Sequence, residues 1–221
     1  MPLYKTTNAG NPHIGLFARA TDKLAAADIS SPPKFLTALA ALGAPILKTT
    51  FGGSGLAGIY LAMNSHGAVV PSFCTNEEMG ALKSFGLNVI SLPGAFCAAG
   101  NNIAANDFGC VANPAIQKQH VKRISDCLGV EVVQRTVAGY QTAGSCVLAT
   151  NRGFIAHNRC GEAELKELSS ILKVQGSNCT LNTGVAFVSL GAIANSRAAI
   201  FGESSTGFEM GRAATALELA D

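Results

Sequence analysis

The chain has 221 residues, of which 48% are hydrophobic and only 14% are charged, and its formal net charge is +2. A positive mean hydropathy of +0.29 combined with so few charges excludes an intrinsically disordered chain. The 16 lysines and arginines are scattered along the chain, so a broad nucleic-acid-binding surface is not expected. This length suits one large domain or two small ones.

The first residues contain no apolar segment of the kind that begins a secretory signal peptide. Two long uncharged stretches, 49–76 and 84–106, contain Asn, Ser, Pro and Gly, which a hydrocarbon interior would penalise. We therefore expect a soluble, cytoplasmic protein that does not associate with membranes.

The seven cysteines are odd in number and irregularly spaced, and no Cys-x-x-Cys pair occurs among them. A zinc site or a disulfide framework needs close, paired spacing. We expect buried, reduced thiols and neither a metal nor a cofactor. The cysteines are Cys74, Cys97, Cys110, Cys127, Cys146, Cys160 and Cys179.

A short apolar strand, a polar turn and a second apolar run recur five times along the chain. The polar residues that mark the turns lie 42 to 45 residues apart, and they are Asp22, Asn64, Asn106, Asn151 and Asn195. Fifteen positions before each of them is a small hydroxyl residue: Thr7, Thr49, Ser91, Thr136 and Thr180. Two sets of markers with one period indicate an internal repeat.

Each unit begins with a hairpin, because Asn and Gly tolerate the positive φ that tight turns require. A helix follows: its apolar residues recur at helical spacing in the first unit, and Thr75 to Glu78 form a capping box in the second. In the third unit, Asn113 and Pro114 predict the start of the helix. Glycines 43, 86 and 129 end the first three helices, and a third strand follows, as at 130–136.

The fifth unit stops at its helix, 206–219, and the missing third strand is supplied by residues 3–7 at the other end of the chain. Closure of this kind removes the open edges of a linear repeat array. We predict one domain, a closed five-bladed, pseudo-fivefold α/β propeller of strand-strand-helix-strand units. Their approximate bounds are 14–57, 58–100, 101–144, 145–189 and 190–221 plus 1–13.

This architecture and period resemble the pentein superfamily. Within it, the chain is similar to the translation initiation factor 6 family, the ribosome anti-association factors of archaea and eukaryotes. The resemblance spans about residues 10–214 and is carried by five segments in order: IGLFA from Ile14, NSHGAVVP from Asn64, ANDFG from Ala105, LNTGVAFVS from Leu181 and IANSR from Ile193. The chain ends just after its fifth helix, as archaeal members do.

The resemblance implies binding rather than catalysis. Members of the family bind the intersubunit face of the large ribosomal subunit, mainly through ribosomal proteins beside the sarcin–ricin loop and with minor rRNA contact. They sterically prevent premature joining of the small subunit. A homologue of the Shwachman–Bodian–Diamond syndrome protein is implied as a release factor. A monomer is expected.

Equivalent loops of a closed ring emerge on one face, and these loops are 8–15, 51–58, 92–102, 137–145 and 181–189. They are rich in Gly, Asn and Ser, and the resemblance implies that they contact the ribosome, notably at a Gly-Asn pair that matches Gly100 and Asn101. The alternative is that they are ordinary connecting loops without a binding role. The residues predicted to bind the ribosome are Asn11, His13, Gly52, Ser54, Gly100, Asn101, Asn102, Tyr140, Gln141 and Thr183. We expect the hairpin asparagines and the hydroxyl markers to serve the fold.

Two other functions stay open. Other penteins modify guanidino groups with a nucleophilic Cys, a His and carboxylates around the central channel, and this chain contains all three residue types. It lacks the long substrate-covering insertions of such enzymes, which disfavours that alternative. A protein-interaction module unrelated to ribosomes would have a similar composition.

Overall fold

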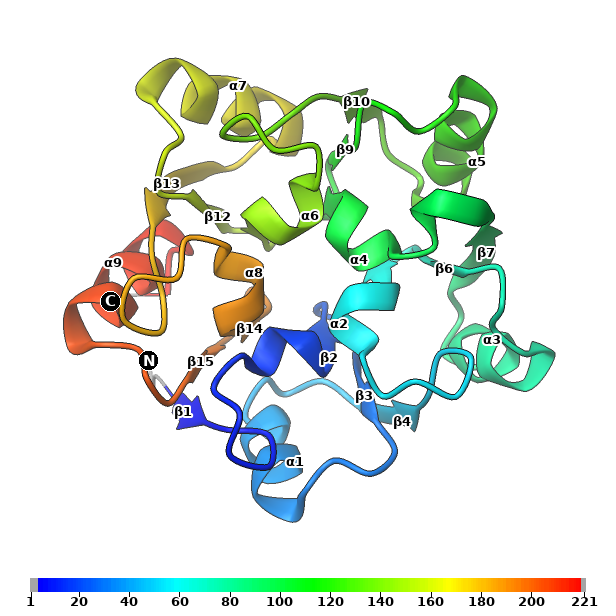
Figure 1. Cartoon of the computed structure of the whole chain (residues 1–221), viewed down its shortest axis with the longest axis horizontal. Helices are drawn as coiled ribbons and strands as arrows, with labels where there is room; N and C mark the ends of the chain where they lie inside the picture. The colour runs from blue at the N-terminus through cyan, green and yellow to red at the C-terminus, as the bar shows by residue number, and fades with distance from the viewer. Residues whose placement is uncertain (1–3, 220–221) are drawn as a thin grey trace.

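The computed structural model describes residues 4–219, with the side chain of residue 95 excepted, and in this part of the chain five three-stranded sheets surround a central axis (Figure 1). Each sheet is one blade and has an inner, a middle and an outer strand. In that order the blades are β2 (Ala18–Ala20), β3 (Ala25–Asp28) and β4 (Ile46–Thr49); β5 (Ala62–Met63), β6 (Gly67–Pro71) and β7 (Asn88–Leu92); β8 (Ile103–Ala105), β9 (Cys110–Ala112) and β10 (Val132–Gln134); β11 (Val147–Ala149), β12 (Gly153–His157) and β13 (Gln175–Cys179); and β14 (Ala192–Ala194), β15 (Ala199–Gly202) and β1 (Tyr4–Thr6).

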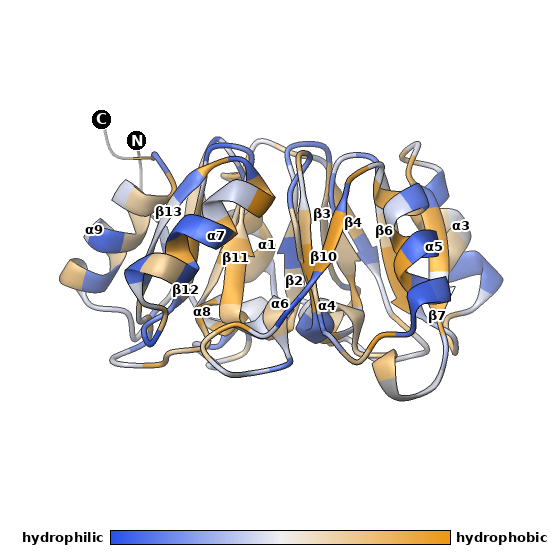
Figure 2. Cartoon of the chain, turned by 90° about the horizontal axis from the view of Figure 1, so that it is seen from above, coloured by the Kyte–Doolittle hydropathy of each residue, from blue (hydrophilic) through white to orange (hydrophobic). Residues whose placement is uncertain are grey.

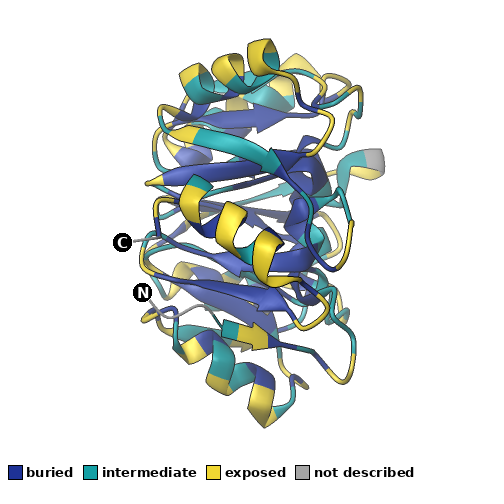
Figure 3. Cartoon of the chain, turned by 90° about the vertical axis from the view of Figure 1, so that its left-hand side faces the viewer, coloured by how far each residue is buried: buried dark blue, intermediate teal, exposed yellow. Residues whose placement is uncertain are grey.

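In every blade the inner and middle strands form an antiparallel hairpin, and the outer strand runs parallel to the middle one. A parallel pair needs a crossover connection, which a helix on the outer rim supplies in the first four blades. The inner and middle strands are mostly buried, the outer strands are partly exposed, and the helices expose their outer faces (Figures 2 and 3). No helix within residues 4–219 is long and apolar enough to span a bilayer. The rim helices are α1 (Pro33–Ala40), α3 (Asn76–Lys83), α5 (Lys118–Leu128), α7 (Glu162–Leu172) and α9 (Gly207–Ala216).

The two ends of the chain meet in the fifth blade. β1 pairs in parallel with β15, with Tyr4 opposite Ile200 and Thr6 opposite Gly202. The inner strand of this blade, β14, packs against β2 of the first blade. The predicted closed five-bladed architecture and its closure by the N-terminal strand are confirmed, although residue 3 of the predicted strand lies outside the described residues.

Asparagines at the hairpin turns tie neighbouring blades together. The Asn64 side-chain oxygen accepts hydrogen bonds from the N–H groups of its own turn, at His66 and Gly67. Its Nδ2 donates to the carbonyls of Asn106 and Leu128 in the next blade, at 3.1 and 2.8 Å. Asn106 and Asn195 repeat this pattern, with carbonyl partners in the blade that follows each of them. A structural role for these three residues follows.

Two of the predicted turn markers are wrong by one residue. The turn position of Asn64 is occupied by Thr150 in the fourth blade and by Thr21 in the first, because their hydroxyls accept the equivalent backbone hydrogen bonds. Asn151 and Asp22 are the next residues along, and both point into the central channel. Two hydroxyl markers shift as well: by strand register, the residues equivalent to Thr180 are Thr50 and Pro93, not Thr49 and Ser91.

The helix boundaries follow most of the predicted signals. The capping box of Thr75 and Glu78 is confirmed. Gly129 ends α5 in the left-handed conformation with φ +66°. The predicted start at Asn113 is wrong, because the Asn113 side chain caps a turn at Ala115 and α5 begins at Lys118.

A ring of five short inner helices was not predicted from the sequence. One of them precedes the inner strand of every blade, and together they surround the axis on the side nearest the viewer of Figure 1. They span only three or four residues, too few to produce a helical periodicity. They are η1 (Ile14–Leu16), α2 (Ala57–Tyr60), α4 (Ala99–Asn102), α6 (Ala143–Cys146) and α8 (Val188–Gly191).

Glycines allow these inner helices to touch. A Cβ atom built on Gly58 would lie 1.6 Å from the carbonyl oxygen of Gly15, and one on Gly100 would lie 2.2 Å from that of Gly58. A Cβ atom built on Gly144 would lie 2.2 Å from the carbonyl oxygen of Gly100, and one built on Gly15 would lie 2.0 Å from that of Ser189. No side chain fits at these positions without moving a backbone.

We predict that Gly58→Ala lowers the free energy of unfolding by on the order of 3 kcal/mol, because the added methyl group overlaps the Gly15 carbonyl. Gly80→Ala is the matched control: Gly80 is also helical, but a Cβ there meets nothing within 4 Å. It should raise the stability by roughly 0.5–1 kcal/mol. Urea denaturation measures both, and equal stabilities of the two variants would contradict the packing argument.

Candidate functional site

The turns that lead into the inner helices lie on one side of the ring, together with those helices, and we call this surface the loop face (Figures 1 and 2). Four of the five turns are closed by a pair of backbone hydrogen bonds between their ends. The closing pairs are Asn8 and Asn11, Phe51 and Ser54, Val137 and Tyr140, and Leu181 and Val185. The five predicted loops contain no Asp, Glu, Lys or Arg.

Left-handed backbone conformations are concentrated in these turns. Gly52 and Gly53 have φ of +63° and +78°, which glycine adopts without steric cost. Ala9, Ala138 and Thr183 have φ of +49°, +53° and +60°, where a Cβ is unfavourable. Strain of this kind persists only where the surroundings hold it in place, and it is frequent at functional sites.

The loop of the third blade is built differently. Pro93 occupies the position of the threonines in the other blades, and the short helix η2 (Gly94–Phe96) follows it directly. The loop then enters α4, so Asn101 lies close to the axis. This blade breaks the pseudo-fivefold symmetry of the loop face.

Buried carboxylates hold two of the turns from below. Glu78, from the capping box of α3, accepts hydrogen bonds from the Thr50 hydroxyl at 2.6 Å and from the N–H groups of Gly52 and Gly53 at 2.8 and 3.2 Å. Glu209, from the capping box of α9, binds the turn at Thr180, Thr183 and Gly184 in the same way. These contacts fix the turn conformations without any occupant on the face.

The hydrogen bonds also set the protonation of both acids. Burial alone would raise the pKa of the Glu78 carboxyl, but the hydrogen bonds from Thr50, Gly52, Thr75 and Gly53 outweigh it and lower that pKa to about 2. In Glu209 the same competition between burial and hydrogen bonding lowers the pKa to about 2. Both carboxylates are therefore charged at neutral pH. A third acid, Glu164, accepts from the N–H of Ala138 at 2.8 Å.

Seven of the ten predicted contact residues have a place in this surface. Gly52, Gln141 and Thr183 are exposed, and Asn11, Ser54, Asn101 and Tyr140 are partly exposed. His13 is also partly exposed. Its backbone N–H donates a hydrogen bond to the Asn11 side-chain oxygen at 2.8 Å, and the chain continues from it directly into η1.

Gly100 and Asn102 face inward. Gly100 is buried against Gly58 in the glycine contacts described above. The Asn102 amide donates to the Ala98 carbonyl at 2.8 Å, and its oxygen accepts from Asn113 Nδ2 at 2.7 Å. Both residues support the neighbouring Asn101 and expose no group for a partner.

Aromatic residues complete the loop face, and most of them were not selected from the sequence. Tyr60 and Phe73 stack edge to face with ring centroids 5.3 Å apart, and Phe73 covers Gly52. Phe73 is 47% exposed. The predicted Tyr140 packs against His157 and Phe187 at 5.1 and 5.0 Å. Partly exposed aromatic pairs are typical anchors of protein–protein contacts. The sequence pattern that could have indicated Tyr60 as a contact residue is the glycine-rich turn that precedes it.

The central channel carries opposite charges at its two ends. Below the loop face, Arg19 donates to the carbonyls of Gly58 and Gly100, both at 3.1 Å, and to the Ser189 hydroxyl. Burial lowers the pKa of the Arg19 guanidinium to about 10, which leaves it charged at neutral pH.

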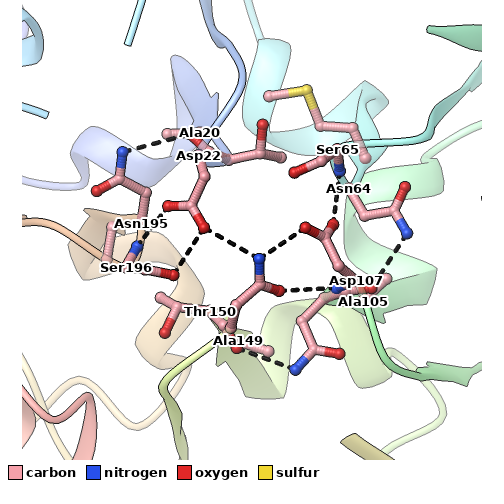
Figure 4. Close-up of a pocket in the computed structure, with 15 residues that line it drawn as sticks. Ala20, Asp22, Asn64, Ser65, Ala105, Asp107, Ala149, Thr150, Asn195 and Ser196 are labelled. Carbon is pink, nitrogen blue, oxygen red and sulfur yellow. Dashed lines mark hydrogen bonds between the residues drawn. The ribbon is translucent and has the colours of Figure 1, made fainter. Parts of the chain in front are cut away.

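At the opposite end of the channel, Asp22 and Asp107 both accept hydrogen bonds from the Asn151 amide, at 3.0 and 2.6 Å (Figure 4). Asp22 also binds the N–H and the hydroxyl of Ser196. The space here is about 20 Å³, room for one or two water molecules. The residues that line this end form a closed hydrogen-bond network rather than an open substrate pocket.

Thiols and imidazoles lie away from both parts of the channel. In the described part of the chain, no Cys or His lines either cavity of the channel. Burial raises the pKa of the Cys110 thiol to about 12, and it also raises the pKa values of Cys127, Cys146 and Cys179. Such thiols are poor nucleophiles at neutral pH.

Comparison with known proteins identifies the family. The sequence profile of the eIF-6 family matches residues 3–216. The chain belongs to the eIF-6 family. Proteins named translation initiation factor 6 are similar to it over nearly their whole length: that of Haloquadratum walsbyi is 35% identical over 212 residues, which cover 95% of this chain and 94% of the relative. Those of Methanosphaerula palustris and Methanoculleus marisnigri are 35% and 36% identical, and each alignment covers 92–93% of this chain and 93% of the relative.

Membership of the eIF-6 family confirms the resemblance inferred from the sequence and supports a role in translation initiation. The family match, residues 3–216, includes the strands of all five blades.

We predict that Glu78→Gln lowers the free energy of unfolding at pH 7 by on the order of 2 kcal/mol, because a neutral amide is a weaker acceptor for the four groups that bind Glu78. The pKa of this carboxyl is lower in the folded chain, so its contribution is complete above about pH 5 and is lost as the pH falls toward 2. The difference between wild type and variant should shrink over that range.

Urea denaturation at pH 7, 5, 3.5 and 2.5 measures this difference. Glu77→Gln is the control, since Glu77 is adjacent on the same helix and exposed. A difference for Glu78→Gln that stays constant from pH 7 to pH 2.5 would show that the carboxylate does not hold the turn as described.

Proposed function

We propose that this eIF-6 family protein binds the large ribosomal subunit through its loop face and sterically prevents premature joining of the small subunit. The relatives named translation initiation factor 6 support a role at this stage of translation. The observation that carries the choice of surface is the set of five uncharged loops on one side of a closed ring, four of which are held by closing hydrogen bonds.

A held surface favours binding because little conformational freedom is lost on docking. The turns are fixed by their own closing hydrogen bonds and by Glu78, Glu164 and Glu209 from below. A patch of moderate size can therefore bind tightly. The body of the ring behind it would act as the steric block to the small subunit.

The absence of ionised side chains from the predicted loops favours ribosomal proteins over rRNA as the principal partners. Contacts to phosphates would need Lys and Arg in the turns themselves. The proposed contact residues combine amides and hydroxyls with an aromatic group, and they are Asn11, Gly52, Ser54, Asn101, Tyr140, Gln141 and Thr183, together with Tyr60 and Phe73. Release would need a further factor that competes for this face, such as a homologue of the Shwachman–Bodian–Diamond syndrome protein.

The guanidino-modifying alternative receives little support from the geometry. That chemistry requires a reactive thiolate beside a base and carboxylates in the channel. Asp22 and Asp107 do line the channel, but each is engaged with Asn151, and the thiols with raised pKa values lie elsewhere. Binding is the better account of this fold.

We predict that Asn101→Arg weakens binding to the large subunit at least tenfold, because it puts a bulky charge in a neutral contact beside the axis. Sucrose-gradient co-sedimentation with separated archaeal subunits measures binding, and remixing the subunits measures the loss of joined ribosomes. Since Asn101 also accepts a hydrogen bond from the Ser145 hydroxyl, thermal unfolding must first establish that the variant is folded.

Gln119→Arg is the matched control, because it makes a similar change on the exposed rim helix α5. It should bind like the wild type. Equal binding by a folded Asn101→Arg variant would move the contact away from α4, and failure of the wild-type protein to co-sediment with either subunit would reject the proposed function.

The binding should also depend only weakly on salt. We predict a slope of log K against log[salt] no steeper than about −2 between 50 and 200 mM salt, the value for roughly two phosphate contacts. Titrations of a fluorescently labelled protein with large subunits measure it. A slope of −5 or steeper would mean that rRNA phosphates dominate the contact.

A further inference from the structure

The outer strand of every blade has one edge that no other strand covers, because each sheet ends there. We propose that the edge of β7, together with the groove between β7 and α5, binds an extended acidic segment of another protein by β-strand addition. This site lies on the outer rim of the ring rather than on the loop face (Figure 1).

The backbone of β7 has hydrogen-bonding groups free for an added strand. The Asn88 N–H donates to the His66 carbonyl, and the Ser72 N–H donates to the Leu92 carbonyl. In a parallel ladder, the backbone N–H and C=O groups of residues 88, 90 and 92 therefore point toward β6. Those of Val89 and Ser91 point away from β6, toward the free edge and the groove. Within residues 4–219, the Ser91 carbonyl receives one long hydrogen bond, from Arg123 Nη2 at 3.4 Å.

The other four edges, which are pseudo-equivalent, are protected. Lys5 and Lys48 occupy the outward positions of β1 and β4, and β10 is only three residues long. On β13, Arg212 donates to both the carbonyl and the side-chain oxygen of Asn178, at 2.8 and 2.6 Å. Charge, shortness and a covering side chain are the usual ways in which proteins prevent strand addition.

β7 lacks the first two protections, and its covering contact is weaker, because Arg123 reaches the Ser91 carbonyl only at 3.4 Å. It spans five residues, Asn88–Leu92, and none of them is charged. Val89 and Ile90 are β-branched and partly exposed, which favours an extended strand with apolar contacts on either side. β13 is equally long, but its sequence of Gln, Gly, Ser, Asn and Cys is a poor strand former. The edge of β7 is therefore the one suited to a partner.

The walls of the groove select the charge of the occupant. The space is about 500 Å³, and Lys83 from α3 and Arg123 from α5 line it. The acid in the same lining, Asp126, is paired with Lys122 at 3.1 Å. Two basic side chains remain to attract carboxylates, so an acidic segment fits and a basic one does not.

Five residues of β7 match a partner segment of about five or six residues, with main-chain hydrogen bonds at Val89 and Ser91. Adjacent residues of an added strand point to opposite faces of the sheet. Two adjacent Glu residues would therefore direct one carboxylate toward Lys83 and the other toward Arg123, and β-branched residues on either side of them would pack against Val89 on one face and Ile90 on the other. The groove would stay open to such a partner while the loop face is occupied.

The probe is the hexapeptide acetyl-Val-Ile-Glu-Glu-Val-Ile-amide, titrated into the ¹⁵N-labelled full chain and followed by NMR. We expect the amide signals of Val89 and Ser91 to shift and their exchange with solvent to slow. Lys83→Glu combined with Arg123→Glu should lower the affinity at least tenfold. Lys118→Glu, the same change on α5 outside the groove, should lower it less than twofold.

Val89→Pro should abolish binding without unfolding the chain, because the N–H that it removes faces the groove and is not part of the ladder with β6. Equal binding of a peptide in which Lys replaces Glu would overturn the proposal. So would signal shifts confined to β13 and α9 or to the loop face, or self-association through β7 in place of peptide binding. None of these outcomes bears on attachment to the ribosome, which is measured separately.

Discussion

Contact between glycine backbones around the central axis sets the dimensions of the whole ring. Gly15, Gly58, Gly100 and Gly144 bring successive inner helices so close that a methyl group at any of them would overlap a carbonyl of its neighbour. At this spacing the carbonyls of Gly58 and Gly100 converge on Arg19, which links three blades through its donors. The inner helices in turn carry Asn101 and the turns of the loop face. The position of the proposed binding surface therefore follows from the glycines, which have no side chain.

The two faces of the ring differ in where their polar groups are placed. On the hairpin side, Asn64, Asn106 and Asn195 tie neighbouring blades together, and Asn151 joins the two channel carboxylates (Figure 4). On the loop side, the charged groups are withdrawn beneath the surface, where Glu78 and Glu209 bind the backbone of the turns. The exposed part of that side is left neutral and rigid, which suits a protein partner.

The repeat period, the five blades and the closing strand could be read from the sequence because they depend on apolar patterning and turn chemistry that recur in every unit. The register of single turns could not, since Thr150 and Asn151 are adjacent and either can cap a turn. The inner helices were missed because a helix of three or four residues has no period. Gly100 and Asn102 looked like loop residues, but Gly100 is buried against Gly58 of the neighbouring blade, and the Asn102 side chain is bound inside its own blade by Asn113. Tyr60 and Phe73 were missed because only the fold brings them together.

The pairing of β1 with β15 has a consequence for the synthesis of the protein. Tyr4 leaves a translating ribosome long before its partner Ile200 does. Until then the fifth blade has no complete sheet, the inner helices cannot form a closed circle, and the contacts with the greatest sequence separation form last. A nascent chain of this protein therefore has no finished loop face, so the proposed attachment to the large subunit requires release of the completed fifth blade from the ribosome that makes it.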